Sequence, residues 1–340
     1  MRQDPAYDIL PQNRPCVVLF SSAGRRVELM NCFRADARGL GISIKVLATD
    51  LNPAYSPACQ FADEAIPMPR CTDAEFIPRM LDVCVRKGAS LIIPTIDTEL
   101  PILAAHRSEF AHCGVRIAIS SPSVVNLARD KRATAQFLQS HGLPVPRTGS
   151  IDDVIADAGS WSWPLILKPV DGSCSKGLHV ISDVAALMAL PVSRLNYVAQ
   201  ELWKGKEYTV NIFFDDTGRL RCAVPHWRYE TRAGEVSKGI TVREPTLMKL
   251  AERLGEKLEG ARGAMCFQAI VRPDGAAAIF EINARFGGGY PLTHAAGARF
   301  SQWLLEESLG RPSTASNQWQ ENLKLLRYDA AVFVGKEREP

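Results

Sequence analysis

Short apolar runs alternate with amphipathic stretches over the first third of the chain. The apolar runs have the length and composition of buried strands, and they occupy residues 16–22, 43–50, 90–97 and 115–121. Helical spacing ending in glycine fills residues 25–41 and 73–88. Parallel strands need crossovers of this kind, whereas antiparallel strands are joined by short turns. The alternation therefore predicts a parallel, doubly wound sheet at residues 15–125, with helices on both faces.

Polar residues follow three of these strands. They occupy residues 21–26 (SSAGRR), 49–50 (TD) and 95–99 (TIDTE). Doubly wound sheets bind ligands at the carboxyl ends of their strands. Two interpretations remain open for Asp50 and Asp97: they cap and solvate the strand ends, or this edge faces an active site. The first turn contains a single glycine and no G-x-G-x-x-G, which argues against a dinucleotide site.

The rest of the chain has a different pattern. Residues 121–148 predict a helix that is closed by Gly142 and followed by two prolines, as at a domain junction. Beyond it, hairpin turns at 216–218 and 273–275 separate strand-like runs. This half is expected to be α+β with antiparallel sheet, so the whole chain is α/β plus α+β.

A loop rich in glycine and serine follows the apolar strand that ends in Lys168. Its candidate phosphate-binding residues are Gly172, Ser173, Ser175, Lys176 and Gly177. Glycine lets backbone N–H groups approach a phosphate, and Ser and Lys add donors and charge. No helix follows the loop at once, so it would act as a flap laid over phosphates. An ordinary hairpin is the alternative.

The segment AQELWKGKEYTVN offers a site for a nucleoside. Gln200, Glu201 and Leu202 end a strand whose backbone would pair with adenine, and the carboxylate of Glu207 would accept both ribose hydroxyls. The alternative for Glu207 is a solvated acid in a Lys-Gly-Lys turn.

Alternating polar residues mark the segment IFEINARFGGG. Glu281, Asn283 and Arg285 fall on one face of a strand, and Gln268 lies on the hairpin partner. Carboxylate and amide oxygens are ligands that Mg²⁺ prefers and shares with phosphates. Arg285 would grip a transferring phosphoryl group. The three glycines that follow would let the chain turn sharply beside the ligand. A half-exposed strand with a polar outer face is the alternative.

The segment PHWRYETRAGEVSKG is the candidate substrate site. Its charged residues are Arg228, Arg232, Glu235 and Lys238. Arginine suits a carboxylate through its bidentate fork, and glutamate suits an ammonium group. The alternative is a charged outer strand.

Taken in order, these motifs together with Lys131 resemble the ATP-grasp superfamily, in its carbamoyl-phosphate-synthetase-like branch. The resemblance implies a Rossmann-like pre-ATP-grasp domain at 15–125, a small lobe with a phosphate flap at 126–198 and a large lobe at 199–310. It implies that Lys131 and Lys168 contact the phosphates of ATP, that Gln200 to Leu202 and Glu207 hold the nucleoside, and that Mg²⁺ or Mn²⁺ is held by Gln268, Glu281 and Asn283. Arg285 would stabilise an acyl phosphate. A flexible arm at 1–14 and a C-terminal segment at 311–340 flank these domains.

The resemblance implies an ATP-dependent carboxylate–amine ligase that forms an acyl phosphate and releases ADP and phosphate. Only one ATP-grasp unit is visible, and lysines stand at 131 and 168 where the synthetase typically has arginines. Both departures favour a stand-alone ligase over carbamoyl phosphate synthesis. The alternatives are a catalytically silent nucleotide-binding subunit and a nicotinamide-dependent oxidoreductase.

Composition narrows the class of partner. The net charge is 40 − 37 = +3, and the basic residues are scattered, so nucleic acid is not an expected partner. The nine cysteines include no C-x-x-C pair, and neither a signal peptide nor a membrane span is evident. We therefore expect reduced thiols and a cytoplasmic protein acting on small molecules. A homodimer is left open as an option for its assembly.

Overall fold

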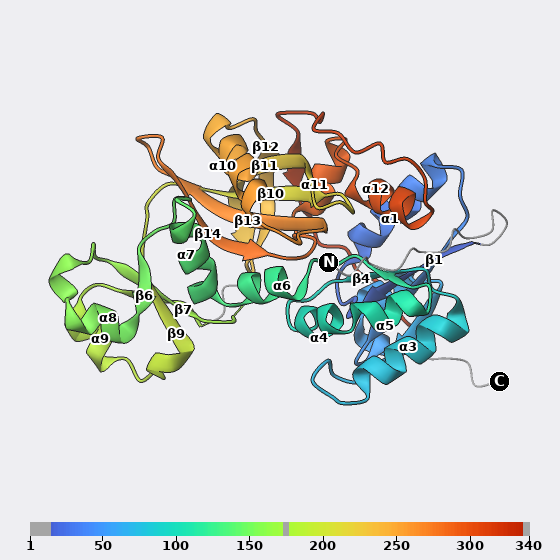
Figure 1. Cartoon of the computed structure of the whole chain (residues 1–340), viewed down its shortest axis with the longest axis horizontal. Coiled ribbons are helices and arrows are strands. Elements are labelled where there is room, and N and C mark those ends of the chain that lie inside the picture. Colours follow the sequence, from blue (N-terminus) through green and yellow to red (C-terminus); the bar gives the residue numbers. More distant parts are fainter. Residues whose placement is uncertain (1–14, 173–176, 336–340) are drawn as a thin grey trace.

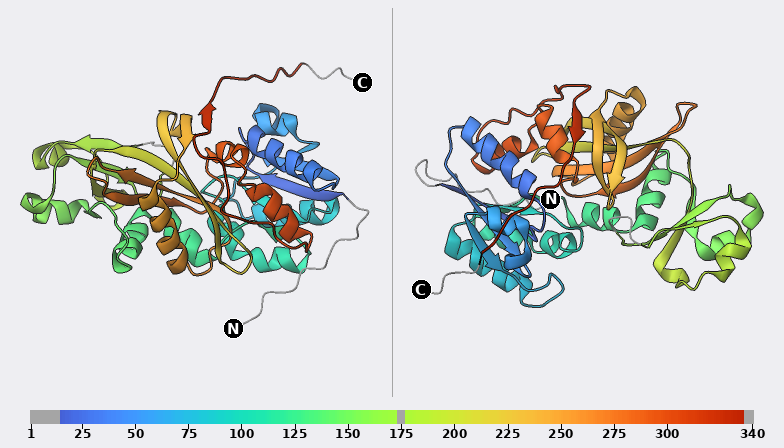
Figure 2. Two further views of the ribbon diagram at one scale, coloured as in Figure 1. Left: turned by 90° about the horizontal axis from the view of Figure 1, so that it is seen from above. Right: turned by 180° about the vertical axis from the view of Figure 1, so that it is seen from behind.

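Three sheets lie in a row along the molecule. The computed structural model describes residues 15–172 and 177–335. In these residues, a five-stranded sheet lies at one end, a four-stranded sheet at the other and a six-stranded sheet between them (Figures 1 and 2). The predicted arm at 1–14 falls outside the described residues.

The five-stranded sheet is parallel throughout, in the order β3-β2-β1-β4-β5, as the alternation predicted. Its strands are β1 (Cys16–Ser21), β2 (Ile44–Asp50), β3 (Glu64–Pro67), β4 (Leu91–Pro94) and β5 (Arg116–Ile117). The helices are α1 (Val27–Gly39), α2 (Pro57–Phe61), α3 (Phe76–Lys87), α4 (Leu100–Ala105) and α5 (Arg107–His112). Successive β1 residues pack into different cores, with Leu19 on the side of α3 and Phe20 on the side of α1. Both faces are therefore covered, which explains why β1 is a continuous apolar run. The short β3 was not predicted.

The single helix predicted after residue 121 is two helices. They are α6 (Pro122–Arg129) and α7 (Lys131–Ser140). Asp130 lies between them with an extended backbone, and its carboxylate accepts hydrogen bonds from the N–H groups of Arg132 (2.8 Å) and Ala133 (3.4 Å). An N-cap of this kind begins a new helix. The break places Lys131 in the first turn of α7.

The four-stranded sheet has the order β6-β9-β7-β8. Its strands are β6 (Thr148–Ser150), β7 (Leu165–Pro169), β8 (His179–Ile181) and β9 (Tyr197–Glu201); its helices are α8 (Ile151–Ala156) and α9 (Val184–Ala189). Strands β7 and β8 are antiparallel neighbours, so the glycine- and serine-rich loop joins two strands as predicted. Strand β9 continues through Glu201, and the predicted domain boundary at residue 198 therefore falls inside it.

The six-stranded sheet is antiparallel, in the order β14-β13-β10-β11-β12-β15. Its strands are β10 (Lys206–Phe214), β11 (Leu220–Arg232), β12 (Glu235–Thr241), β13 (Gly263–Val271), β14 (Ala277–Asn283) and β15 (Lys324–Leu326). Its helices are α10 (Pro245–Lys257), α11 (Tyr290–Ala295) and α12 (Phe300–Ser308). Short 3-10 turns occur elsewhere: η1 (Pro53–Tyr55) beside the parallel sheet, and η2 (Ala158–Ser160) and η3 (Arg194–Asn196) beside the four-stranded sheet. Part of the C-terminal segment, up to residue 326, packs onto this body, because β15 extends the sheet and Trp319 is buried in the core beside α12.

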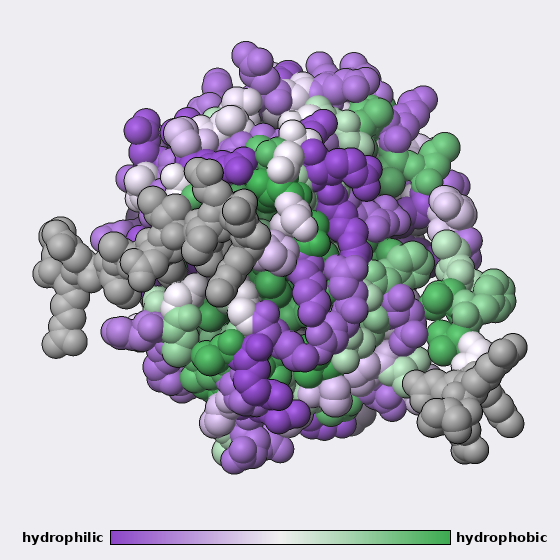
Figure 3. Space-filling model, turned by 90° about the vertical axis from the view of Figure 1, so that its right-hand side faces the viewer, coloured by the Kyte–Doolittle hydropathy of each residue, from purple (hydrophilic) through white to green (hydrophobic). Residues whose placement is uncertain are grey.

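The surface shows no broad apolar band on the face seen in Figure 3, where hydrophilic and hydrophobic residues are interspersed. Among the described residues, none of the helices combines the length and the apolar character needed to cross a membrane.

Candidate functional site

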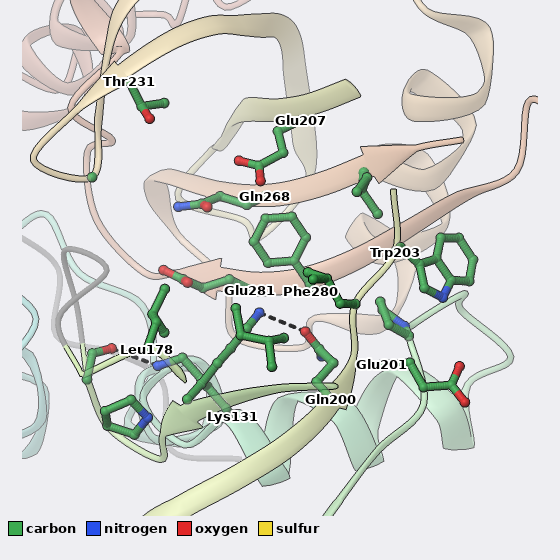
Figure 4. A pocket seen from close by; sticks show the side chains of 18 of the residues that line it. Lys131, Leu178, Gln200, Glu201, Trp203, Glu207, Thr231, Gln268, Phe280 and Glu281 are labelled. Atoms are coloured by element: carbon green, nitrogen blue, oxygen red, sulfur yellow. Dashed lines mark hydrogen bonds between the residues drawn. The ribbon is translucent and has the colours of Figure 1, made fainter. Parts of the chain in front are cut away.

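A cavity of about 250 Å³ opens between the four-stranded and six-stranded sheets (Figure 4). It gathers residues predicted from separate motifs, namely Lys131, Lys168, Gly172, Gln200, Glu201, Leu202, Glu207, Arg228, Gln268 and Glu281. Trp203 and Phe280 add aromatic surface to its lining. The fold thus brings the predicted phosphate, nucleoside and metal residues to one place.

Lys168 is a buried residue of this cavity, and its side chain contacts Gln200 and Phe280. The residue is 8% exposed, and its Nζ donates a hydrogen bond to Gln200 Oε1 at 2.7 Å. The same nitrogen lies 4.6 Å from the ring centroid of Phe280. Burial lowers the pKa of Lys168 to about 8, although the Glu281 carboxylate favours the charged form. The site therefore holds a desolvated cation whose charge is sensitive to mildly alkaline pH.

Lys131 reaches the start of the glycine- and serine-rich loop from α7. Its Nζ donates to the carbonyl oxygen of Gly172 at 2.7 Å, and burial lowers its pKa. A Cβ at Gly172 would lie 2.8 Å from Pro169 Cβ, and Gly177 has a φ of +70° that favours glycine. Three of the predicted phosphate-binding residues fall outside the described residues: Ser173, Ser175 and Lys176.

The predicted nucleoside residues are arranged differently from one another. The Glu201 carboxylate accepts from the Ser162 N–H at 3.0 Å and is directed away from Gln268 and Glu281 (Figure 4). The Leu202 N–H already donates to the Pro164 carbonyl at 3.2 Å, so this amide is engaged within the protein. Glu207 is half-exposed at the opposite wall of the cavity.

The predicted metal residues lie on the paired strands β13 and β14. Gln268 is directly opposite Glu281, and Asn283 is opposite Cys266. The Asn283 side-chain N–H group donates to Glu281 Oε1 at 3.0 Å, which leaves the amide oxygen of Asn283 available as an acceptor. Within residues 15–172 and 177–335, no group of three or more His, Cys, Asp or Glu is placed to hold a metal. The donor set here is one carboxylate and two amides.

Arg285 is already paired within the protein. Its Nε and Nη2 donate to the two carboxylate oxygens of Asp97 at 2.8 and 2.7 Å, and its Nη1 donates to the Phe286 carbonyl at 3.0 Å. Burial works against the charged form, but the Asp97 carboxylate outweighs it and raises the pKa of Arg285. Asp97 thus ties the loop after β4 to the segment that follows β14, and it lines a cavity together with Glu281 and Asn283, so this edge borders the candidate site. Asp50 instead accepts from the Gly24 N–H at 3.0 Å, the capping alternative.

A smaller cavity of about 70 Å³ lies beside these metal residues. Of the predicted substrate residues, Arg228, Glu235 and Arg285 line it. Arg232 and Lys238 do not, which corrects the sequence-based interpretation. Strand β11 has bulges between Arg228 and Thr231, so Arg232 does not share the inward face of Arg228; it is exposed and pairs with exposed Asp329. Lys238 on β12 is also exposed and lies 2.7 Å from Glu230.

Arg228 connects two of the predicted subsites. Its side chain is 7% exposed, and its Nη1 donates to Gln268 Oε1 at 2.9 Å while lying 3.4 Å from Glu207 Oε2. Its Nη2 donates to the Gly234 carbonyl at 2.8 Å. Because its guanidinium is already engaged by these protein groups, Arg228 is better placed to orient Gln268 and Glu207 than to bind a substrate.

The three glycines after Arg285 are explained by close packing. None of Gly287, Gly288 and Gly289 has a positive φ, so the sharp turn that the sequence suggested is not the reason. A Cβ at Gly289 would lie 2.6 Å from Nε2 of His226, and one at Gly287 would lie 3.0 Å from Asn211 Oδ1. Glycine lets this backbone lie directly on buried side chains of the sheet.

We expect Gly289→Ala to lower the free energy of unfolding by about 1–3 kcal/mol, because the new methyl group would press on a rigid, buried imidazole ring. Urea unfolding monitored by circular dichroism measures the change. Gly159→Ala is the matched control, since its Cβ would meet nothing within 4 Å. Equal stability of the two variants would contradict the packing explanation.

Arg26 lines the smaller cavity and was not among the predicted site residues. It follows β1, and its Nη1 lies 3.5 Å from Glu235 Oε1 on β12. The only signal in the sequence was its position in the SSAGRR stretch at a strand end.

Comparisons with known proteins match two separate parts of the chain. Residues 18–118 match the family of PylC-like N-terminal domains, and residues 128–289 match an ATP-grasp domain family. A D-alanine–D-alanine ligase of Stutzerimonas stutzeri (strain A1501) is 33% identical over 144 residues, which is 40% of this chain and 46% of that protein. The large chain of carbamoyl phosphate synthase of Mycobacterium sp. (strain JLS) is 29% identical over 103 residues, which is 29% of this chain and 9% of that protein.

Among solved structures, the chain is similar to the biotin carboxylase domain of 2-oxoglutarate carboxylase from Hydrogenobacter thermophilus, crystallised as a dimer with MgADP and bicarbonate. The TM-score is 0.72 at 16% identity, and the match covers 90% of this chain and 73% of that one. At this identity the likeness concerns the fold. The matched part of the chain spans about half the length of the D-alanine–D-alanine ligase.

Proposed function

Because the chain belongs to the ATP-grasp superfamily, with a PylC-like domain before its ATP-grasp domain, we propose that it is an ATP-dependent carboxylate–amine ligase. The observation that carries the proposal is the cavity in which Lys131 and Lys168 face Glu281 across the two lobes. One buried and one partly buried lysine opposite an acid and two amides form a suitable site for a metal-bound polyphosphate. The curated ligases that the chain resembles support the same reaction class.

ATP would lie along the larger cavity. Lys131 and Lys168 would contact its phosphates from the small lobe, and Gly172 begins the loop that would cover them. Phe280 offers an aromatic face for the base, while Glu207 lies where it would accept the ribose hydroxyls. The flap residues Gly177, Ser173, Ser175 and Lys176, and the roles of Gln200 to Leu202, remain part of the proposal.

The metal residues fit Mg²⁺ by their chemistry, and Mn²⁺ would meet the same oxygen donors. Glu281 supplies a carboxylate, and the free amide oxygen of Asn283 lies on the same face of β14. Gln268 would help from β13, where Arg228 orients its amide oxygen. When bound, the metal would neutralise charge that develops on the transferred phosphoryl group.

The proposed reaction has two steps. An oxygen of the substrate carboxylate forms a bond to the γ-phosphorus of ATP while the bond to ADP breaks. The amine nitrogen of the second substrate then attacks the carbonyl carbon, loses a proton and displaces phosphate. Arg285 lies at the metal strand's end, where it would stabilise the acyl phosphate as a catalytic residue alongside Lys168. Small-molecule substrates follow from this scheme, whereas a homodimer and cytoplasmic residence remain predictions from the sequence.

The test is a screen for ADP release. The protein is mixed with ATP, Mg²⁺ and a pool of the twenty L-amino acids with D-alanine, and ADP and phosphate are measured with and without the pool. We expect release that depends on the pool and yields equal amounts of the two products. Binding of ATP without any pool-dependent release would support a silent subunit instead, and tight binding of NAD(P) would support an oxidoreductase.

The affinity for ATP should fall as pH rises above about 8. Burial lowers the pKa of Lys168 to about 8, so the side chain is charged below this pH and becomes neutral above it. A phosphate prefers the charged form, so binding above pH 8 requires proton uptake and weakens by up to about tenfold per pH unit. Calorimetric titration from pH 7 to 9.5 measures this slope. Lys168→Met should bind weakly with a flatter slope; an unchanged slope would contradict the assignment.

A further inference from the structure

The loop after β1 holds Arg26 in a defined place. Ser22 and Gly24 both have positive φ, at 51° and 50°. The Gly24 N–H donates to Asp50 at 3.0 Å, and the Ser56 hydroxyl donates to the Gly24 carbonyl at 3.1 Å. Strands β1 and β4 are neighbours in the sheet, but the chain goes from β1 to β2 on one side and from β4 to β5 on the other. Open parallel sheets bind ligands at such a point, beyond the carboxyl ends of the strands. Arg26 is thus presented from a braced loop at the ligand-binding edge.

Arg26 is the least well-paired arginine of the smaller cavity. Its side chain is 20% exposed, and within the described residues its one ion pair is with Glu235, at 3.5 Å. The same carboxylate has a closer partner in Arg327, at 2.9 Å, and Arg285 is paired with Asp97 at both oxygens. A largely buried guanidinium with no close carboxylate of its own is costly unless an anion joins it.

The charges around Arg26 separate this end of the site from the phosphate end. Burial lowers the pKa of Arg26, and the charges that act on it are those of Arg285, Glu235, Asp97 and Arg327. Lys168 is influenced instead by Glu281, Lys131 and Glu207. Of the two cavities, Arg26 lines the smaller one, whereas Lys131 and Lys168 line the larger one. An anion bound by Arg26 would therefore lie apart from the two lysines, in the cavity that borders the metal residues.

Resting on the ligase proposed above, we propose that Arg26 binds the free carboxylate of the amine-donating substrate, which is therefore an amino acid. The carboxylate that becomes phosphorylated has to reach the phosphates of ATP beside Lys131, Lys168 and Glu281 in the larger cavity, which Arg26 does not line, so the carboxylate at Arg26 is the one left unactivated. The planar fork of arginine matches a carboxylate with two parallel hydrogen bonds. The N-terminal domain would then select the acceptor that the ATP-grasp domain couples.

The experiment follows the logic of a double-mutant cycle, in which Arg26 is changed in the protein and the free carboxylate is removed from the substrate. Each amino acid that supports ADP release as the amine donor is compared with its carboxamide, which keeps the amine but lacks the charge. In the wild type we expect the carboxamide to have a KM at least about tenfold higher. In the Arg26→Gln variant, the KM for the amino acid should rise by the same factor, and the KM for the carboxamide should not rise further. The KM for ATP should change by less than about twofold.

Arg25→Gln is the matched control, because Arg25 is the exposed neighbour on the same loop. It should behave as the wild type. If Arg26→Gln fails to fold, Arg26→Lys serves in the same cycle, since it keeps the charge but loses the fork. If the ratio of the KM for the carboxamide to the KM for the amino acid is the same in the wild type and in Arg26→Gln, this inference alone is overturned. Absence of pool-dependent ADP release in the wild type overturns it together with the proposed function.

Discussion

Glu281→Gln lowers the rate of ATP turnover by roughly 100-fold or more while the protein remains folded. The change removes the single carboxylate of the proposed metal site and replaces it with a weaker neutral ligand, so charge developing on the phosphoryl group loses stabilisation. Glu281 also faces Lys131 and Lys168, whose charged forms it favours. The measurement is steady-state ADP release at saturating ATP and substrate.

Glu252→Gln is the control for this prediction, because it makes the same chemical change at an exposed position on α10. It should turn over ATP at the wild-type rate. A Glu281→Gln protein that works within about threefold of wild type would show that the carboxylate is not a metal ligand. Circular dichroism spectra of both variants check that the fold is retained.

Arg285→Ala is expected to lower kcat by about 100-fold or more, since a group that stabilises transition-state charge is lost. The same variant should also be less stable by about 2–4 kcal/mol, because Asp97 would be left as a largely buried, unpaired carboxylate. The two effects have different origins and need to be separated. Steady-state kinetics and urea unfolding, measured on the same preparation, give both values.

The double variant Asp97→Ala/Arg285→Ala separates them. Removing both partners takes away the unpaired charge, so most of the lost stability should return. The rate should not return, because the guanidinium is still absent. Recovery of kcat in the double variant would show that Arg285 only anchors Asp97, and the proposed catalytic role would then be withdrawn.

The spacing of residues along the chain was sufficient to predict much of the candidate site. Glu281 and Asn283 share a strand face because side chains alternate with a period of two. A short turn at 273–275 then made Gln268 their neighbour on the partner strand, and the structure pairs Gln268 with Glu281. The parallel N-terminal sheet was predicted for a similar reason, since a buried run and the amphipathic helix after it are both local patterns. Strand alternation, short turns and amphipathic helices can all be recognised because each is encoded within a few consecutive residues.

Other features depend on contacts between distant segments, and only the tertiary structure decided them. Arg285 and Asp97 are 188 positions apart, and no local pattern encodes their pairing. Arg232 had the right chemistry for a substrate ligand, but the hairpin carries it outward to Asp329. Arg26 had no motif of its own, yet the shared core between the N-terminal domain and the six-stranded sheet brings it to Glu235 on β12. The sequence determines the chemistry of each side chain. Which residues surround that side chain depends on how the sheets pack, because packing brings together surfaces from every part of the chain.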